Sequence, residues 1–235
     1  MTTRLISVIL PVHDQADHIA RIVVEHEEAL ARLQYPHEML LVVNGCRDRS
    51  LDECQALQAR FPTIRVVASE RGGWGLAVRI GLGEARGDLI CYTNSARTST
   101  KELMLFLLYA TVHPGVVIKA NRKIRESWRR RLGSLLFNLQ CRFLFDLPCW
   151  DINGTHKVFP RSFHKLLELS REDNLIDAEF NVVCRREGYP MIEVPVISVR
   201  RHGGESTTGY RAAVGMYFGA FQLWRQLGAW EEPNG

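Results

Sequence analysis

The sequence predicts an α/β fold in which helices flank a mostly parallel sheet and a helical tail follows at the C-terminus. Apolar segments of strand length alternate with segments of helical period along the first half of the chain. The sequence contains no internal repeat and no low-complexity linker. A chain of 235 residues with 46% hydrophobic side chains is long enough to bury one sizeable core. We therefore expect residues 1–235 to form a single domain.

The first half holds the regular part of this alternation. Residues 5–12 form an apolar, β-rich run, and the apolar side chains that follow it recur with the period of a helix. Asp14 and Asp17 precede that helix as candidate caps. The same patterns predict strands at 39–43, 64–68 and 89–93, and helices at 50–60, 74–85 and 101–111.

The second half departs from the regular order. A short strand at 116–119 is followed by a basic amphipathic helix at 128–145. In the tail, aromatic and apolar side chains recur at helical spacing from Tyr210 to Trp224, which predicts a helix packed on the fold itself or on a second subunit. The remaining predictions are strands at 155–159 and 191–199 and a helix at 178–187.

Charge and cysteine content narrow the class of protein. The net charge is only +4, but residues 119–142 hold eight basic side chains against Glu126 alone. Nucleic-acid binding is disfavoured, because no aromatic stacking platform accompanies this basic block. The six cysteines show no C-x-x-C spacing, and neither a signal peptide nor an apolar run of about 18–20 residues is present. We expect a cytoplasmic protein with reduced thiols that does not cross a membrane.

Ligands of parallel sheets lie at the carboxyl ends of the strands. Asn44 stands at such an end, where its amide can pair with a base or ribose or can form a structural Asx turn, and the Asx turn is favoured. The glycines of segment 72–75 permit close backbone approach ahead of a helix whose N–H groups attract anions. Their spacing matches neither G-x-G-x-x-G nor a P-loop, which disfavours dinucleotide and ATP binding.

The strand expected at 89–93 ends in Asn94, Ser95 and Ala96. Many enzymes place paired carboxylates at such a strand end, where they hold a divalent cation against a diphosphate. Mg²⁺ and Mn²⁺ favour carboxylate ligands over one amide and one hydroxyl. No divalent metal cofactor is therefore expected.

Five segments that occur in order resemble the family 2 glycosyltransferases of GT-A fold, a Rossmann-like arrangement. The last two are similar to the polyprenyl-phosphate mannosyltransferase and glucosyltransferase branch of that family. The resemblance implies an inverting transfer of a sugar from a nucleoside diphosphate-sugar donor, with UDP favoured over GDP. It also divides the domain into a nucleotide-sugar-binding half (1–115), an acceptor and catalytic half (116–207) and a helical tail (208–235). The five segments are residues 7–14, 42–50, 71–88, 151–159 and 193–206.

The sequence departs from the family pattern at two places. Val43 and Asn44 stand where the family has an acidic pair, although the later Asp48 is retained. The metal-binding D-x-D of the family falls on residues 94–96, so both of its carboxylates are missing. The chain is then either a metal-independent enzyme or an inactive nucleotide-binding relative. We favour metal-independent catalysis, because the later segments keep the family pattern.

The resemblance implies catalytic roles for three residues. Arg201, beside His202, is expected to stabilise the departing diphosphate, because a guanidinium donates hydrogen bonds to phosphate oxygens and stays charged. Asp177 is expected either as the general base for a hydroxyl acceptor or as the N-cap of the following helix. Asp151 orients Lys157, contacts the acceptor or is a buried turn carboxylate. The expected substrate-binding residues are Pro11, Val12, His13, Asp14, Asn44, Asp48, Gly73, Asn94, Ser95, Ala96, Lys157, Glu179, His202 and Ser206.

The expected acceptor is a small soluble hydroxyl compound, because no membrane-spanning segment follows the last of these segments. The alternative acceptor is a polyprenyl phosphate at the membrane surface. An apolar stripe runs through segment 126–150 beside three consecutive arginines. An exposed stripe would indicate peripheral membrane contact, whereas a buried stripe would simply be core. A homodimer through the C-terminal helix also stays open.

Overall fold

The computed structural model describes residues 4–95, 99–124, 128–197 and 210–227. The strands are β1 (Ile6–Val12), β2 (His37–Asn44), β3 (Ile64–Ser69), β4 (Leu89–Tyr92), β5 (Val117–Ile124), β6 (Lys157–Pro160) and β7 (Met191–Ile197). The helices are α1 (Ile19–Leu30), α2 (Ser50–Arg60), α3 (Trp74–Glu84), α4 (Thr100–Val112), α5 (Trp128–Phe145), α6 (Ile176–Arg186) and α7 (Tyr210–Leu227), with a 3-10 helix η1 (His164–Leu167).

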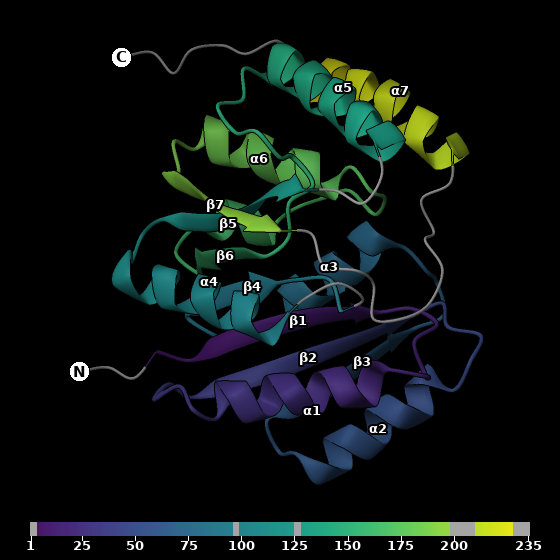
Figure 1. Cartoon of the computed structure of the whole chain (residues 1–235), viewed down its shortest axis with the longest axis vertical. Coiled ribbons are helices and arrows are strands. Elements are labelled where there is room, and N and C mark those ends of the chain that lie inside the picture. The colour runs from purple at the N-terminus through teal and green to yellow at the C-terminus, as the bar shows by residue number, and fades with distance from the viewer. Residues whose placement is uncertain (1–3, 96–98, 125–127, 198–209, 228–235) are drawn as a thin grey trace.

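The seven strands form one sheet in the order β3-β2-β1-β4-β6-β5-β7 (Figure 1). The first four strands along the chain are parallel, and β5 pairs in parallel with β7. β6 lies antiparallel between β4 and β5 and places Lys157 opposite Tyr92. The two parallel halves of the sheet are therefore joined by one reversed strand.

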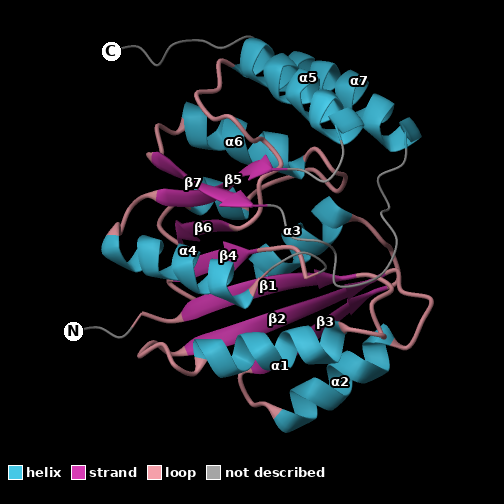
Figure 2. Ribbon diagram, viewed as in Figure 1, coloured by secondary structure: helices cyan, strands magenta, loops and turns pink. Residues whose placement is uncertain are grey.

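Helices cover both faces of the sheet (Figure 2). On one face, Val8 and Leu10 of β1 pack with apolar side chains of α1, α2 and α4. On the other face, Ile9 and Val42 pack with side chains of α3 and α6. Since alternate residues of β1 enter different cores, the strand is buried on both sides, as its continuous apolar run predicts.

Helices α5 and α7 form a further layer that lies beyond α6 (Figure 1). Phe137 and Cys141 of α5 pack with Ala178 of α6 and with Ala220 and Leu223 of α7. No helix in the described part of the chain is both long and apolar enough to span a bilayer. The predicted alternation and the C-terminal helix are confirmed.

The predicted caps of α1 are wrong. The helix begins at Ile19, and its N-cap residue His18 makes no side-chain capping bond. Asp14 instead accepts a hydrogen bond from the backbone N–H of Arg47 at 2.7 Å. Asp14 bonds to Arg47 because the fold brings the turn between β1 and α1 next to the turn between β2 and α2.

The predicted N-cap role of Asp177 is also wrong. Helix α6 begins at Ile176, two residues earlier than the sequence pattern predicts, and Leu175 is the N-cap residue. Ile176 is fully buried in the core between the sheet and α6. Asp177 is thereby placed inside the first helical turn, where its side chain faces the sheet side of the helix and finds other partners.

Candidate active site

The carboxyl ends of β1 and β2 lie side by side, because Val12 pairs with Val43 in the parallel register. His13 follows β1, and its Nδ1 lies 2.7 Å from the carbonyl oxygen of Asn44. A carbonyl oxygen only accepts, so Nδ1 of His13 is the donor, while Nε2 lies 3.7 Å from the carboxylate of Asp14. Pro11 and Val12 are buried in the sheet and position this edge by their backbone.

Asn44 holds two turns together. Its Nδ2 donates to the carbonyl oxygen of Val12 at 2.9 Å, and its Oδ1 accepts from the N–H of Gly73 at 2.9 Å. Gly45 has a φ of +57°, and a Cβ there would lie 2.6 Å from the Cα of Gly72. The side-chain amide of Asn44 is buried, and its hydrogen bonds are made within the fold. This geometry agrees with a structural role for Asn44 and leaves its amide no free donor for a base.

Asp48 stabilises the start of α2. Its carboxylate accepts from the N–H and the hydroxyl of Ser50 at 3.0 and 2.6 Å, and from the N–H of Ala16 at 2.9 Å. Burial raises the pKa of Asp48, but these hydrogen bonds outweigh it and hold the pKa below its ordinary value. The carboxylate therefore fixes the loop around the predicted nucleotide site.

The glycines ahead of α3 allow the chain to approach itself. A Cβ at Gly75 would lie 2.4 Å from the carbonyl oxygen of Asp173. The N–H of Leu76, in the first turn of α3, donates to the carbonyl oxygen of Glu172 at 3.0 Å. The segment around Asp173 thus occupies the space that the sequence suggested for a ligand, and the anion-binding interpretation of this helix start finds no support.

The end of β4 offers poor ligands for Mg²⁺ or Mn²⁺. Ser95 is buried, and its hydroxyl donates to the carbonyl oxygen of Pro11 at 2.7 Å. Asn94 contributes an amide rather than a carboxylate. Among the described residues, one group of three could hold an ion: His13, Asp14 and Cys46, whose ligand atoms lie within 4.8 Å. One imidazole, one thiol and one carboxylate suit softer metals, so this structure does not fit a hard-cation site at either place.

Asp177 lies at the centre of a buried polar cluster. One carboxylate oxygen accepts from the hydroxyl of Tyr92 at 3.0 Å and forms an ion pair with Lys157. The other accepts from the indole N–H of Trp74 at 3.0 Å. Burial lowers the pKa of Lys157, and the carboxylate of Asp177 opposes that shift. Lys157 has no exposed side-chain surface and Asp177 has 6%, so the pair faces the protein interior.

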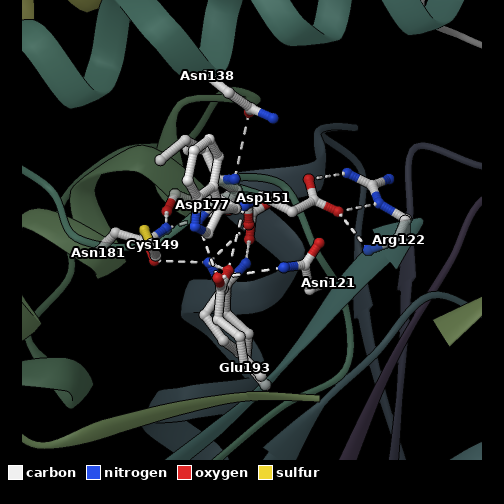
Figure 3. Close-up of polar contacts among 12 residues, drawn as sticks. Asn121, Arg122, Asn138, Cys149, Asp151, Asp177, Asn181 and Glu193 are labelled. Carbon is white, nitrogen blue, oxygen red and sulfur yellow. Dashed lines mark hydrogen bonds and ion pairs between the residues drawn. The ribbon is translucent and has the colours of Figure 1, made fainter. Parts of the chain in front are cut away.

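Asp151 forms a second ion pair. Its carboxylate receives Nε and a terminal nitrogen of Arg122 at 2.7 and 2.8 Å, a bidentate geometry that Figure 3 shows. The backbone N–H of Arg122 also donates to it at 3.0 Å. Burial lowers the pKa of Arg122, but Asp151 outweighs this and raises it above its ordinary value. Asp151 therefore orients Arg122 rather than Lys157.

Three polar residues beside Asp151 were not among the predicted site residues. Lys119 is fully buried, and its Nζ donates to the carbonyl oxygen of Asp151 at 2.6 Å and to Oδ1 of Asn181 at 2.9 Å. Glu193 accepts from the backbone N–H groups of Trp150 and Asp151 (Figure 3). Lys119 and Asn181 carry no sequence signal, because a lysine in a strand and an asparagine in a helix are usually exposed.

Glu179 shapes the loop that follows η1. Its two oxygens accept from the N–H groups of Ser170 and Arg171, and one also accepts from the hydroxyl of Ser170 at 2.6 Å. A pocket of about 560 Å³ opens beside this loop, lined among others by Arg71, Gly72, Arg171 and Glu179. Glu179 thus builds a wall of the pocket, while Glu172 and Asp173 pair with the nearby arginines.

Four predicted site residues lie outside the described part of the chain: Ala96, Arg201, His202 and Ser206. Their roles stay predictions. Within the described part, the structure brings His13, Asp14, Asn44 and Asp48 together at one edge of the sheet, and gathers Asp151, Lys157 and Asp177 in the buried clusters.

Stability is expected to fall as the pH drops from about 6.5 towards 5, because of His156. Its complete burial, with a smaller contribution from His26, lowers its pKa to about 3. An unfolded histidine has a pKa of about 6.5, so in this window the unfolded chain binds a proton that the folded chain does not. The free energy of unfolding should decrease by up to about 1.4 kcal/mol per pH unit from this group. Urea titrations between pH 7 and 5 measure the slope.

The matched variant is His156→Phe, which keeps a ring against Phe106, 4.8 Å away between ring centres. It should flatten the slope between pH 6.5 and 5. An unchanged slope in the variant would assign the effect to other groups.

Sequence comparisons find relatives along most of the chain. Residues 7–167 match the family model described as Glycosyl transferase family 2. A protein named undecaprenyl-phosphate 4-deoxy-4-formamido-L-arabinose transferase, from Edwardsiella ictaluri, is 25% identical over 222 residues, which cover 92% of this chain and 67% of that protein. A protein of the same name from Pseudomonas paraeruginosa is 26% identical over 205 residues, covering 86% and 60%. Across three curated relatives of this name, the region aligned with this chain covers between 59% and 67% of the relative's length.

Two solved structures share the fold. Glucosyl-3-phosphoglycerate synthase from Mycobacterium tuberculosis, in complex with Mn²⁺, uridine diphosphate and phosphoglyceric acid, superposes with a TM-score of 0.72 at 16% identity, over 97% of this chain and 80% of that one. Mannosyl-3-phosphoglycerate synthase from Rubrobacter xylanophilus gives a TM-score of 0.72 at 19% identity, over 99% and 77%. At these identities the likeness shows the fold alone, and it confirms the predicted GT-A fold.

Proposed function

Because this chain belongs to glycosyl transferase family 2, we propose that it is a glycosyltransferase that transfers a sugar from a UDP-sugar to the phosphate of a polyprenyl carrier. The observation that carries this choice of acceptor is the state of Asp177, whose carboxylate is buried and held by Trp74, Tyr92 and Lys157. A hydroxyl acceptor needs a base to remove its proton, whereas an ionised phosphate is already a nucleophile. The names of the curated relatives support the same acceptor.

The proposed reaction is a single displacement. An oxygen of the acceptor phosphate forms a bond to the anomeric carbon of the sugar, and the bond from that carbon to the diphosphate breaks. The electron pair leaves with the nucleoside diphosphate, and the configuration at the anomeric carbon inverts. No proton has to be removed, so the catalytic task is to stabilise negative charge on the leaving group, which falls to Arg201 and His202 in this proposal.

The donor site is proposed at the carboxyl edge of β1, β2 and β4, within residues 1–115, with the acceptor half in 116–207. His13 and Asp14 lie there as a pair, 3.7 Å apart between Nε2 and a carboxylate oxygen, and the turns held by Asn44 and Asp48 shape the site. The mycobacterial neighbour binds UDP together with Mn²⁺, which supports UDP as the nucleotide. Since the end of β4 lacks carboxylates, we propose that this chain binds its donor without a divalent cation.

UDP is expected to bind with the same affinity in EDTA and in Mn²⁺, because Asn94 and Ser95 offer no carboxylate to the cation. Isothermal calorimetry of the purified protein measures both affinities. A loss of more than about tenfold in EDTA, roughly 1.4 kcal/mol, would contradict metal independence. The matched variant Asn94→Asp/Ala96→Asp restores the D-x-D pattern and should make binding stronger with Mn²⁺ than with EDTA.

A pair of acceptors that differ only in the phosphate tests the transfer itself. The protein is incubated with labelled UDP-sugars and either a short-chain, water-soluble isoprenyl phosphate or the corresponding isoprenol. Label is expected in the phosphate product alone. Transfer to the alcohol would overturn the proposed acceptor. UDP binding without turnover on any acceptor would leave a non-catalytic nucleotide-binding relative.

A small soluble hydroxyl acceptor is the second candidate, and the pocket of about 560 Å³ favours it. The pocket adjoins Gly72 at the predicted nucleotide edge and is large enough for a small polar molecule. The mycobacterial neighbour was solved with phosphoglyceric acid, a compound of that size. Turnover with soluble hydroxyl acid phosphates, and none with isoprenyl phosphates, would select this candidate.

A further inference from the structure

The outer face of α5 carries a stripe of exposed leucines and one phenylalanine. Their spacing of three or four residues places them on one side of the helix. The opposite side, which includes Phe137 and Cys141, packs on α6 and α7. The stripe is therefore additional to the core rather than part of it. Its members are Leu132, Leu135, Leu136, Leu139 and Phe143, with exposures of 50, 54, 51, 64 and 88%.

Helix α7 lies beside α5 and also exposes large apolar side chains. The hydroxyl of Tyr217 donates to the carbonyl oxygen of Gly133 at 2.6 Å, and Gln140 donates to the carbonyl oxygen of Tyr217 at 2.9 Å, so α5 and α7 lie side by side. Phe218 and Phe221 of α7 are 70% and 47% exposed. In Figure 1 the two helices form the layer farthest from β1, β2 and β3. A cluster of large exposed apolar side chains on one layer is typical of an interaction surface.

The charge of the two helices indicates what covers this surface. Together α5 and α7 contain six arginines and neither an aspartate nor a glutamate. The guanidinium of Arg142 lies 3.9 Å above the ring of Trp150, which is 62% exposed beside the end of α5. Among the arginines whose side chains are described, Arg131 and Arg225 are exposed and Arg142 is half-buried. An exposed apolar stripe on helices that carry arginines and no acidic residue, next to an exposed tryptophan, matches the interface of an anionic lipid bilayer. A second copy of the chain would instead bring like charges together.

We propose that α5 and α7 form a docking surface that lies in the plane of an anionic membrane. The stripe enters the boundary between headgroups and acyl chains, and the arginines contact lipid phosphates. The biological purpose of this surface rests on the proposed function, because docking would hold the enzyme where a polyprenyl phosphate is found. Docking itself depends on the two helices alone.

Vesicle sedimentation tests the surface without any sugar donor or acceptor. The whole chain is mixed with vesicles of phosphatidylcholine alone or of equal parts phosphatidylcholine and phosphatidylglycerol. We expect binding to the anionic vesicles that weakens as salt is raised, and little binding to the neutral ones. The variant Leu139→Ser/Phe143→Ser should bind the anionic vesicles at least tenfold more weakly. Absence of binding to anionic vesicles would overturn the proposal.

The matched control is Leu105→Ser/Leu108→Ser, which removes two exposed leucines, 42% and 48% exposed, from α4. It should bind vesicles like the wild type. Equal losses in both double variants would show that general hydrophobicity, rather than this surface, drives binding. Sedimentation equilibrium gives a further outcome: a wild-type dimer that Leu139→Ser/Phe143→Ser converts to a monomer, with unchanged vesicle binding, would assign the surface to a second copy.

The vesicle result and the acceptor result are independent. Vesicle binding without transfer to a soluble isoprenyl phosphate would keep the docking surface and remove the proposed function. Transfer to the soluble phosphate without vesicle binding would support the proposed function and remove the docking surface.

Discussion

Replacement of Asp177 with asparagine is expected to lower the free energy of unfolding by about 3 to 5 kcal/mol. Lys157 is fully buried and forms its ion pair with Asp177, so the change leaves an ammonium group in the interior without a counter-charge. The rings of Tyr92 and Phe180 lie 5.2 and 5.4 Å from Nζ and stabilise the cation by far less than a carboxylate does. Urea denaturation of both proteins measures the difference.

A double-mutant cycle provides the control for this stability effect. Lys157→Met alone leaves the Asp177 carboxylate without its cation and should also destabilise the fold. The combination Asp177→Asn/Lys157→Met removes both charges, so it should recover much of the loss. A destabilisation by Asp177→Asn of less than about 1 kcal/mol would contradict the view that the buried charge of Lys157 depends on Asp177.

The same Asp177→Asn variant separates the two acceptors in kinetic measurements, which are made at a temperature where the variant remains folded. With an isoprenyl phosphate, we expect kcat to stay within a fewfold of the wild type, because no base is needed. With a hydroxyl acceptor and Asp177 as the base, kcat would fall by about 10² to 10⁴ while nucleotide binding stayed intact. That second outcome would reverse our choice of acceptor.

Arg201→Ala is expected to lower the transfer rate by about 10² to 10³, the loss typical of removing one group that stabilises charge in a transition state. Arg201 lies outside the described residues, and the prediction follows from its place in segment 201–206 of the family pattern. Arg201→Lys keeps the charge but loses the planar fork and should recover only part of the rate. Single-turnover kinetics, with enzyme in excess over the labelled UDP-sugar and the acceptor saturating, isolates the transfer step.

The control for Arg201 is Arg32→Ala. Arg32 is exposed just after the end of α1, near the amino end of β2, whereas the predicted donor site lies at the carboxyl ends of the strands. It should leave both turnover and UDP binding unchanged. Equal losses in the two alanine variants would remove Arg201 from its proposed position at the leaving diphosphate.

The local elements follow from the sequence because their signals are local. The run at 5–12 and the helical stripe after it predict β1 and α1 to within a residue or two. Errors arise where a boundary depends on distant packing. Helix α6 starts early because Ile176 is drawn into the core, which no neighbour in sequence reveals.

The contacts of the site residues do not follow from the sequence in the same way, because residue type does not fix the partner of a polar side chain. The position of Asn44 after a strand predicts a polar site residue, but its structural role depends on the N–H of Gly73, which the fold brings within 2.9 Å of its side-chain oxygen. Asp177 was identified as a carboxylate in a family segment, but its partners Trp74 and Tyr92 lie 103 and 85 residues away. Such contacts form only in the folded chain, where α6 packs against α3 and β4.

The sequence by itself determined the family and the order of strands and helices, because motifs and periodicity are properties of neighbouring residues. It also showed that residues 94–96, after β4, include no carboxylate. The tertiary structure alone decided which polar groups are buried and which apolar side chains are exposed. The apolar stripe of α5 has the same sequence pattern whether it faces the core or the solvent. Only the packing of its opposite side on α6 and α7 leaves Phe143 at the surface, and only the fold buries Lys157 against Asp177.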